Sequence, residues 1–268
     1  MELRKGLKLL RGSPNTLIAG KYVVDPGQPA ERATEIIAEV GNTPVVLLTH
    51  FHADHLTATP DDAEVYAPWG EELLVSSVKA RLFFTHGVYM ENAVYKGNDL
   101  RVVGVIKPGD RAGPFEAVPL PGHTFGQIGF YAEGVLHAGD ALFGEKVLKK
   151  YGVPYLMDVD AFLESLERIR SLEPEMLVMG HGPVAGSRKR IAEMIDANRA
   201  AVERAVKLVE VMLPGDLTAV AVKVIKATAA EHGWENVLLT MTTVRAVLSK
   251  LSREGRVYID ENGMWRTN

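Results

Sequence analysis

The sequence predicts an α/β fold, a layered sandwich of strands and helices followed by a small C-terminal module. Short apolar segments interrupted by helices, with both strand faces apolar, are typical of such layers. The 268 residues are 47% hydrophobic, which is enough for one large core or for a core with a small appended domain. Two helices and a hairpin are expected after Pro214. We therefore predict a domain at residues 1–213 and a winged-helix-like domain at residues 214–268.

The first part of the chain contains short strands broken by glycine and proline. A helix is expected at residues 29–40, where Ile36, Ile37 and Val40 share one face and Gly41 follows. Residues 69–78 also have helical spacing. Strands are expected at residues 7–10, 16–19, 22–25, 45–48 and 65–67.

Residues 81–100 mix aromatic side chains, His86 and glycine without a regular period. This composition fits a surface helix packed by its aromatic residues. It also fits a loop that shapes a substrate pocket, because long loops in compact domains are often functional.

The second part of the chain repeats the pattern of strands and helices. Residues 143–155 are expected to form a loop, and Thr240 is expected to cap the last helix. Strands are expected at residues 101–106, 115–120, 127–131, 134–138 and 176–179. Helices are expected at residues 160–172, 187–213, 217–231 and 241–254, before a hairpin of residues 256–259 and 264–266.

A cluster of potential metal ligands follows the predicted strand at residues 45–48. His50, His52, Asp54 and His55 lie within six residues of one another. Histidine and aspartate side chains are rarely buried without a binding partner. Several of them at one strand end therefore indicate that they share a partner. Neutral imidazole and carboxylate groups are common ligands of divalent metals, and a metal site is the expected explanation.

Three later strands also end beside a ligand-type residue. These residues are His123, Asp140 and His181, and each has a neighbouring glycine. Glycine allows unusual backbone angles and close approach of the chain. A short loop can therefore direct the His or Asp beside the glycine toward a site shared with the other loops.

The His-x-His-x-Asp-His run and these three residues resemble the metallo-β-lactamase superfamily. The resemblance implies an αββα sandwich and two divalent metal ions. The first ion would bind His50, His52 and His123, and the second would bind Asp54, His55 and His181, with Asp140 bridging both. Zinc is the expected metal, with iron or manganese as alternatives.

Two metals in such a site share a hydroxide that attacks a carbonyl or phosphoryl centre. Asp54 is the expected catalytic residue, because its carboxylate can orient that nucleophile. Asp25 is expected to form a turn or to contact a ligand. His137 and His232 are not expected to bind metal, since neither follows the ligand pattern.

The order of the motifs is similar to the branch of the superfamily with a C-terminal winged helix, which includes β-lactamase-like protein 2 and glyoxalase II-like hydrolases. The glyoxalase II branch has a Cys-containing run after its bridging Asp, and this chain has no Cys, so a glutathione thioester is less favoured as the substrate. The lactonase branch has a Tyr three residues after its bridging Asp, where this chain has Phe143. Tyr151 or Tyr155 could replace it only through the geometry of the pocket.

A binuclear hydrolase of a small ester, thioester or lactone is the expected function. The alternative is a single-strand endoribonuclease or phosphodiesterase, since two metals suit a phosphodiester. RNA then becomes a partner, and a homodimer is also left open. A third hypothesis, a DNA-binding regulator without activity, does not explain the intact ligand pattern.

Charge and composition favour the small-molecule substrate. The net charge is −4, and the charges beyond residue 214 nearly balance, so no general attraction to nucleic acid is expected. Lys250, Arg253 and Arg256 could form a basic patch, as could the lysines at 146, 149 and 150. The lack of a long apolar segment predicts a cytoplasmic protein without a membrane partner.

Overall fold

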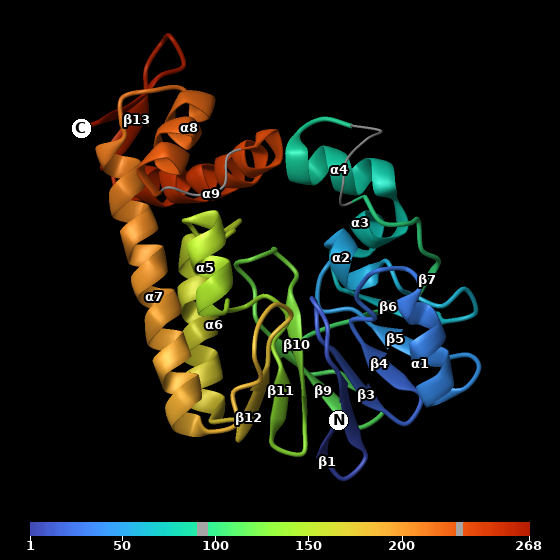
Figure 1. The fold of residues 1–268 in the computed structure, drawn as a ribbon. Coiled ribbons are helices and arrows are strands. Elements are labelled where there is room, and N and C mark those ends of the chain that lie inside the picture. Colours follow the sequence, from blue (N-terminus) through green and yellow to red (C-terminus); the bar gives the residue numbers. More distant parts are fainter. Residues whose placement is uncertain (90–95, 229–232) are drawn as a thin grey trace.

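The computed structural model contains two stacked β-sheets with helices on both outer faces (Figure 1). It describes residues 1–89, 96–228 and 233–268. The layers follow the order helix, sheet, sheet, helix, as predicted. Within the described residues, no helix combines the length and the apolar character needed to cross a membrane.

The first sheet has seven strands in sequence order, and its later strands run parallel. Its buried parallel strands are almost wholly apolar, as expected when both faces are covered. The strands are β1 (Glu2–Arg4), β2 (Leu7–Leu10), β3 (Thr16–Ala19), β4 (Tyr22–Val24), β5 (Val45–Leu47), β6 (Glu64–Pro68) and β7 (Val102–Ile106).

The second sheet has five strands in the order β12-β11-β10-β9-β8. Only the β11–β12 pair is parallel. The strands are β8 (Arg111–Ala112), β9 (Phe115–Pro119), β10 (Ile128–Ala132), β11 (Val135–His137) and β12 (Met176–Val178).

Alternating side chains build separate apolar layers on the two faces of the first sheet. On β5, Val45 and Leu47 pack between the sheets, whereas Val46 packs on the outer face, because successive side chains point to opposite sides. The outer face is covered by α1 (Arg32–Val40), α2 (Ala53–Leu56) and α3 (Glu72–Ser76), with α4 (Val78–His86) following.

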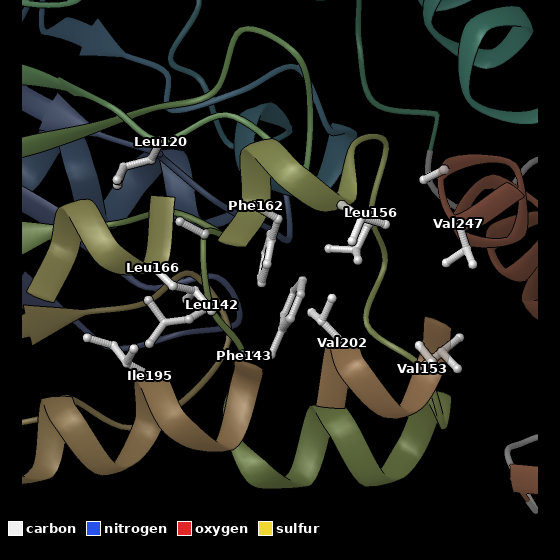
Figure 2. Packing of buried hydrophobic residues seen from close by; sticks show 14 of the residues in the cluster. Leu120, Leu142, Phe143, Val153, Leu156, Phe162, Leu166, Ile195, Val202 and Val247 are labelled. Carbon is white, nitrogen blue, oxygen red and sulfur yellow. The ribbon is translucent and has the colours of Figure 1, made fainter. Parts of the chain in front are cut away.

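The outer face of the second sheet is covered by α5 (Glu145–Tyr151), α6 (Val159–Leu172) and α7 (Arg188–Val211). Figure 1 shows α7 running alongside α5 and α6. In Figure 2, Phe143 and Phe162 lie side by side, and their rings stack with centroids 6.2 Å apart.

The C-terminal segment contains α8 (Leu217–Thr228), α9 (Trp234–Arg253) and a hairpin of β13 (Val257–Ile259) and β14 (Trp265–Thr267). Val220 of α8 and Val247 of α9 belong to the same buried cluster as Phe162. The apolar core therefore continues across Pro214. The domain boundary at this residue and the winged-helix assignment remain predictions.

Two predicted elements were wrong. Residues 145–151 form α5 rather than a loop, with Gly144 before the helix and Gly152 after it. The last helix begins at Trp234, so Thr240 lies inside α9 and does not cap it. The prediction rested on Thr240, a residue type that is common at helix N-termini, whereas Gly233 occupies the position before the helix. His232 and residues 90–95 lie outside the described residues.

Phe162→Ala is expected to lower the free energy of unfolding by about 3–5 kcal/mol, because a large buried ring leaves a cavity when it is removed. Phe162 is fully buried, whereas Phe83 is 64% exposed. Urea denaturation would measure the change, with Phe83→Ala as the matched control. Equal losses in the two variants would contradict the proposed packing.

Candidate metal centre

The seven predicted ligand residues meet where four strands end. His50, His52, Asp54 and His55 follow β5, and the last two lie in α2. The others come from the loops after β9, β11 and β12, namely His123, Asp140 and His181. We call the seven residues the histidine–aspartate cluster.

The cluster contains three groups of mutually close ligand atoms. Within each group, one nitrogen or oxygen of each side chain lies within 4.8 Å of the others. The groups are His50-His52-His123, His50-His55-Asp140 and Asp54-His55-His181. They include all seven residues predicted from the sequence.

Asp140 lies between the two predicted ligand sets. Its Oδ2 is 3.7 Å from His123 Nε2 and 3.6 Å from His181 Nε2, and its Oδ1 is 3.5 Å from His55 Nε2. Donor atoms at about 2.0–2.2 Å from one tetrahedral ion are themselves about 3.3–3.6 Å apart. These separations fit shared coordination by one or more ions.

Several buried donor atoms of the cluster have no hydrogen-bond partner in the described part of the chain. They are Nε2 of His50, Nε2 of His52, Nε2 of His55 and Oδ1 of Asp140. Burying a polar atom without a hydrogen bond is unfavourable in free energy. A group of such atoms close together therefore indicates a binding partner that the protein itself does not supply. A divalent cation satisfies nitrogen and carboxylate donors together, and the residues therefore fit a metal.

Electrostatics keep several imidazoles neutral, as metal binding requires. Burial and the neighbouring histidines hold the pKa of His50 well below its usual value. Burial likewise lowers the pKa of His123 to about 4. Burial alone would raise the pKa of Asp140, but His181 and His55 hold it below its usual value, so this carboxylate is ionised.

Asp25 stabilises the loop after β5 through buried contacts with Thr49 and His55. Its carboxylate accepts hydrogen bonds from the backbone N–H and the hydroxyl of Thr49, and its Oδ2 is 2.8 Å from His55 Nδ1. Burial alone would lower the pKa of His55, yet Asp25 and Asp140 raise it well above its usual value. Of the two roles expected for Asp25, the structure shows contact with a predicted ligand.

Gly180 allows the last loop to approach the cluster. A Cβ atom at this position would collide with the carboxylate of Asp140 and the ring of His55. The glycine beside His181 is thus required by close packing, which agrees with the expectation drawn from its position.

Glu71 is a functional candidate that the sequence did not reveal. It is buried, and its Oε1 accepts hydrogen bonds from the Thr124 hydroxyl and the Gly126 N–H. These hydrogen bonds connect the loop that carries His123 to the start of α3. Burial raises the pKa of Glu71 to about 7. No local motif marks it, because its partners are distant in sequence.

The other described histidines lie outside the three ligand groups. His137 is buried in β11, and its Nε2 is 3.0 Å from the Asn15 carbonyl oxygen, in agreement with a packed side chain. His86 of α4 is half-buried and lines the cavity described next. The segment around His86 is thus a helix that also shapes a pocket.

A cavity of about 340 Å³ opens onto the cluster. Its walls come from α4, α5 and α9 as well as from the metal loops. Tyr155 packs its ring against those of His52 and His123, with centroid distances of 5.1 and 5.0 Å. Phe143 lies 5.6 Å from the His123 ring and offers no hydroxyl group.

The αββα layers and this cluster define an α/β domain with a candidate metal centre. Residues 12–181, more than half of the chain, match the family model of the metallo-beta-lactamase superfamily. The chain belongs to the metallo-beta-lactamase superfamily.

Curated relatives lie in the glyoxalase II-like part of this family. The chain is 31% identical to a hydroxyacylglutathione hydrolase from Xanthomonas axonopodis pv. citri over 187 residues, which cover 68% of this chain and 64% of that protein. It is 24% identical to the beta-lactamase-like protein 2 homologue of Caenorhabditis elegans over 260 residues, 91% of this chain and 80% of that one. The chain thus spans less than two thirds of the length of the first of these relatives.

Solved structures share the whole fold. A beta-lactamase domain protein from Burkholderia ambifaria aligns with a TM-score of 0.70 and 21% identity, over 100% of this chain and 93% of that one. A metallo-beta-lactamase family protein from Thermus thermophilus aligns with a TM-score of 0.68 and 22% identity, over 100% of both chains. These likenesses extend through the C-terminal helices and hairpin.

Asp25→Asn is expected to weaken zinc binding about 10–100-fold, because a hydrogen-bonded partner orients the imidazole of a metal ligand. Competition with a chromophoric chelator would measure the dissociation constant. Asp62→Asn is the control, since Asp62 is exposed and contacts the Thr43 N–H instead. If a folded Asp25→Asn protein bound zinc with unchanged affinity, Asp25 would not orient His55 for metal binding.

Proposed function

We propose that this protein is a binuclear metal-dependent hydrolase that cleaves a small ester or thioester. The observation that carries the proposal is the convergence of the seven-residue cluster on a cavity large enough for a small ligand. In the first ion's site we place His50, His52 and His123.

For the second ion we propose Asp54, His55 and His181, with Asp140 shared between the two ions. When bound, the two ions would supply Lewis-acid charge and lower the pKa of a shared water toward neutrality. Zinc suits the nitrogen-rich ligands, and iron or manganese would also accept them.

Asp54 is the residue we assign to orienting the water. Its carboxylate is half-buried and lines the cavity, and its Oδ2 is 2.8 Å from His181 Nε2. Ser13 in turn lies 2.8 Å from His181 Nδ1, which fixes that ring on its other side. Held in this way, a carboxylate oxygen of Asp54 can accept a hydrogen bond from the water that attacks a carbonyl carbon.

An ester or thioester is favoured over a lactone. Two observations support this preference: the relatives named hydroxyacylglutathione hydrolase, and Phe143 at the position where the lactonase branch has its tyrosine. Tyr155, which the sequence left as a substitute, packs its ring on two histidines. Burial raises the pKa of its hydroxyl, which makes Tyr155 a weaker proton donor than an exposed tyrosine.

Ion pairing weakens the alternative of RNA cleavage. Lys250 and Arg253 both bind the carboxylate of Asp160, and Arg256 pairs with Glu210 and Glu254. A phosphate-binding surface needs cations that are available to phosphate oxygens. Lys149 likewise pairs with Glu145 on α5.

The role we favour for residues 214–268 is therefore to cover the cavity. The endoribonuclease alternative and homodimer formation remain predictions.

Asp54→Asn is expected to lower kcat for thioester hydrolysis about 10²–10⁴-fold, because it removes the group that positions the water. Asp140→Ala is expected to remove both activity and bound metal. Asp196→Asn, at an exposed position of α7, is the control. Rates would be measured on zinc-loaded protein together with the metal content of each variant.

Chelation should abolish the activity and zinc should restore it. A fully metal-loaded Asp54→Asn protein with normal kcat would refute the assigned role. Cleavage of single-stranded RNA that is lost in the same variant would instead support the alternative function.

A further inference from the structure

The cavity has a second part, beyond the metal cluster, that the proposed chemistry does not use. The N-terminal half of α9 supplies much of its wall. Asn236 and Thr240 are four residues apart on this helix, as are Leu239 and Thr243, so one helix face lines the cavity. Figure 1 shows this end of α9 next to α4.

Apolar side chains from three helices cover this part of the cavity. Leu82 comes from α4, Leu148 from α5 and Leu239 from α9. Leu148 and Leu239 are only half-buried, so part of each side chain faces open space. Val153, after α5, adds to the same surface.

Arg81 also lines the cavity, but its guanidinium group is occupied. Nε and Nη2 both donate to the Lys96 carbonyl, and Nη2 also donates to that of Asn98. Nη1 donates to the carbonyls of Leu74 and Val75. All five N–H donors of the side chain are used, so none is left for a substrate carboxylate.

The hydroxyl group of Thr243, which lines the same wall, is also occupied. Thr243 donates its hydroxyl to the Pro154 carbonyl and accepts from the Leu156 N–H. Among lining residues in the described parts of the chain, the other charged groups away from the metal cluster are Lys150 and Glu235. Lys150 is exposed, with its Nζ over the Tyr151 ring, and Glu235 would repel an anion.

We propose that this part of the cavity binds the uncharged, linear acyl chain of a thioester or ester substrate. This inference rests on the proposed hydrolase function and names its substrate class. Water adds to the carbonyl carbon, the C–S or C–O bond breaks, and the acyl group leaves as a carboxylic acid. The thiol or alcohol takes the remaining proton.

The test uses zinc-loaded full-length protein and thioesters of N-acetylcysteamine with acetyl, butanoyl, hexanoyl and octanoyl chains. The chain has no Cys, so a thiol-reactive dye reports only the released product. We expect kcat/KM to rise about three- to fourfold per added methylene group until the cavity is filled. An adipoyl thioester, in which a carboxylate replaces the terminal methyl group of the hexanoyl chain, should react about tenfold more slowly or worse.

Variants on two helices locate the acyl site. Leu239→Gln and Leu148→Gln should each reduce the ratio of octanoyl to acetyl kcat/KM about tenfold, mainly through KM for the long chain. Leu238→Gln is the matched control, because Leu238 is half-buried on α9 but does not line the cavity. It should keep the wild-type ratio, and thermal denaturation should show that all three variants fold.

The outcomes separate the two proposals. Hydrolysis with no dependence on chain length, or an adipoyl rate equal to the hexanoyl rate, overturns the acyl site but leaves the hydrolase function standing. An unchanged ratio in both Leu239→Gln and Leu148→Gln also overturns the acyl site. Failure to cleave any thioester or ester with full zinc occupancy overturns the hydrolase function and the acyl site together.

Discussion

Burying imidazoles and carboxylates at one edge of the two sheets is the constraint on which the rest of the structure depends. His50 and His55 are fully inaccessible to solvent, and Asp140 is almost so. Removing such groups from water is unfavourable unless they gain partners of comparable strength. Apolar layers on either side of the sheets hold these loops in place, and Asp25 orients one ring. The donor atoms that lack a hydrogen-bond partner in the described residues, Nε2 of His50 and His55 and Oδ1 of Asp140, fit a shared cation.

Local patterns explain why the fold and the cluster could be predicted. Four of the seven residues lie in one short run, and the other three each follow an apolar strand and adjoin a glycine. These patterns indicated a metal site at strand ends, and the resemblance to the superfamily, carried by the same residues, supplied the αββα layers and the grouping of the ligands. For Asp25 the resemblance allowed either a turn or a contact with a ligand, and the structure shows the contact with His55.

Features that depend on distant contacts could not be predicted. Glu71 supports the His123 loop through residues more than fifty positions away, and nothing near it in sequence signals this. The Gly, Lys and Tyr content of residues 143–155 suggested a loop, although a short helix forms at residues 145–151. In α9, packing against α4, α6 and α7 outweighs the low helix propensity of its threonines. Tertiary contacts therefore decided the elements that local preference left uncertain.

The origin of the cavity walls has a further consequence. The proposed metal ligands lie between residues 50 and 181, whereas the wall opposite them comes from α9, which begins at Trp234. Changes in α9 can therefore reshape the space without altering any group that holds the ions. During divergence, a chain built in this way could acquire new selectivity through its C-terminal segment while inheriting the same reaction. The catalytic loops and the substrate-selecting helix could then change independently during evolution.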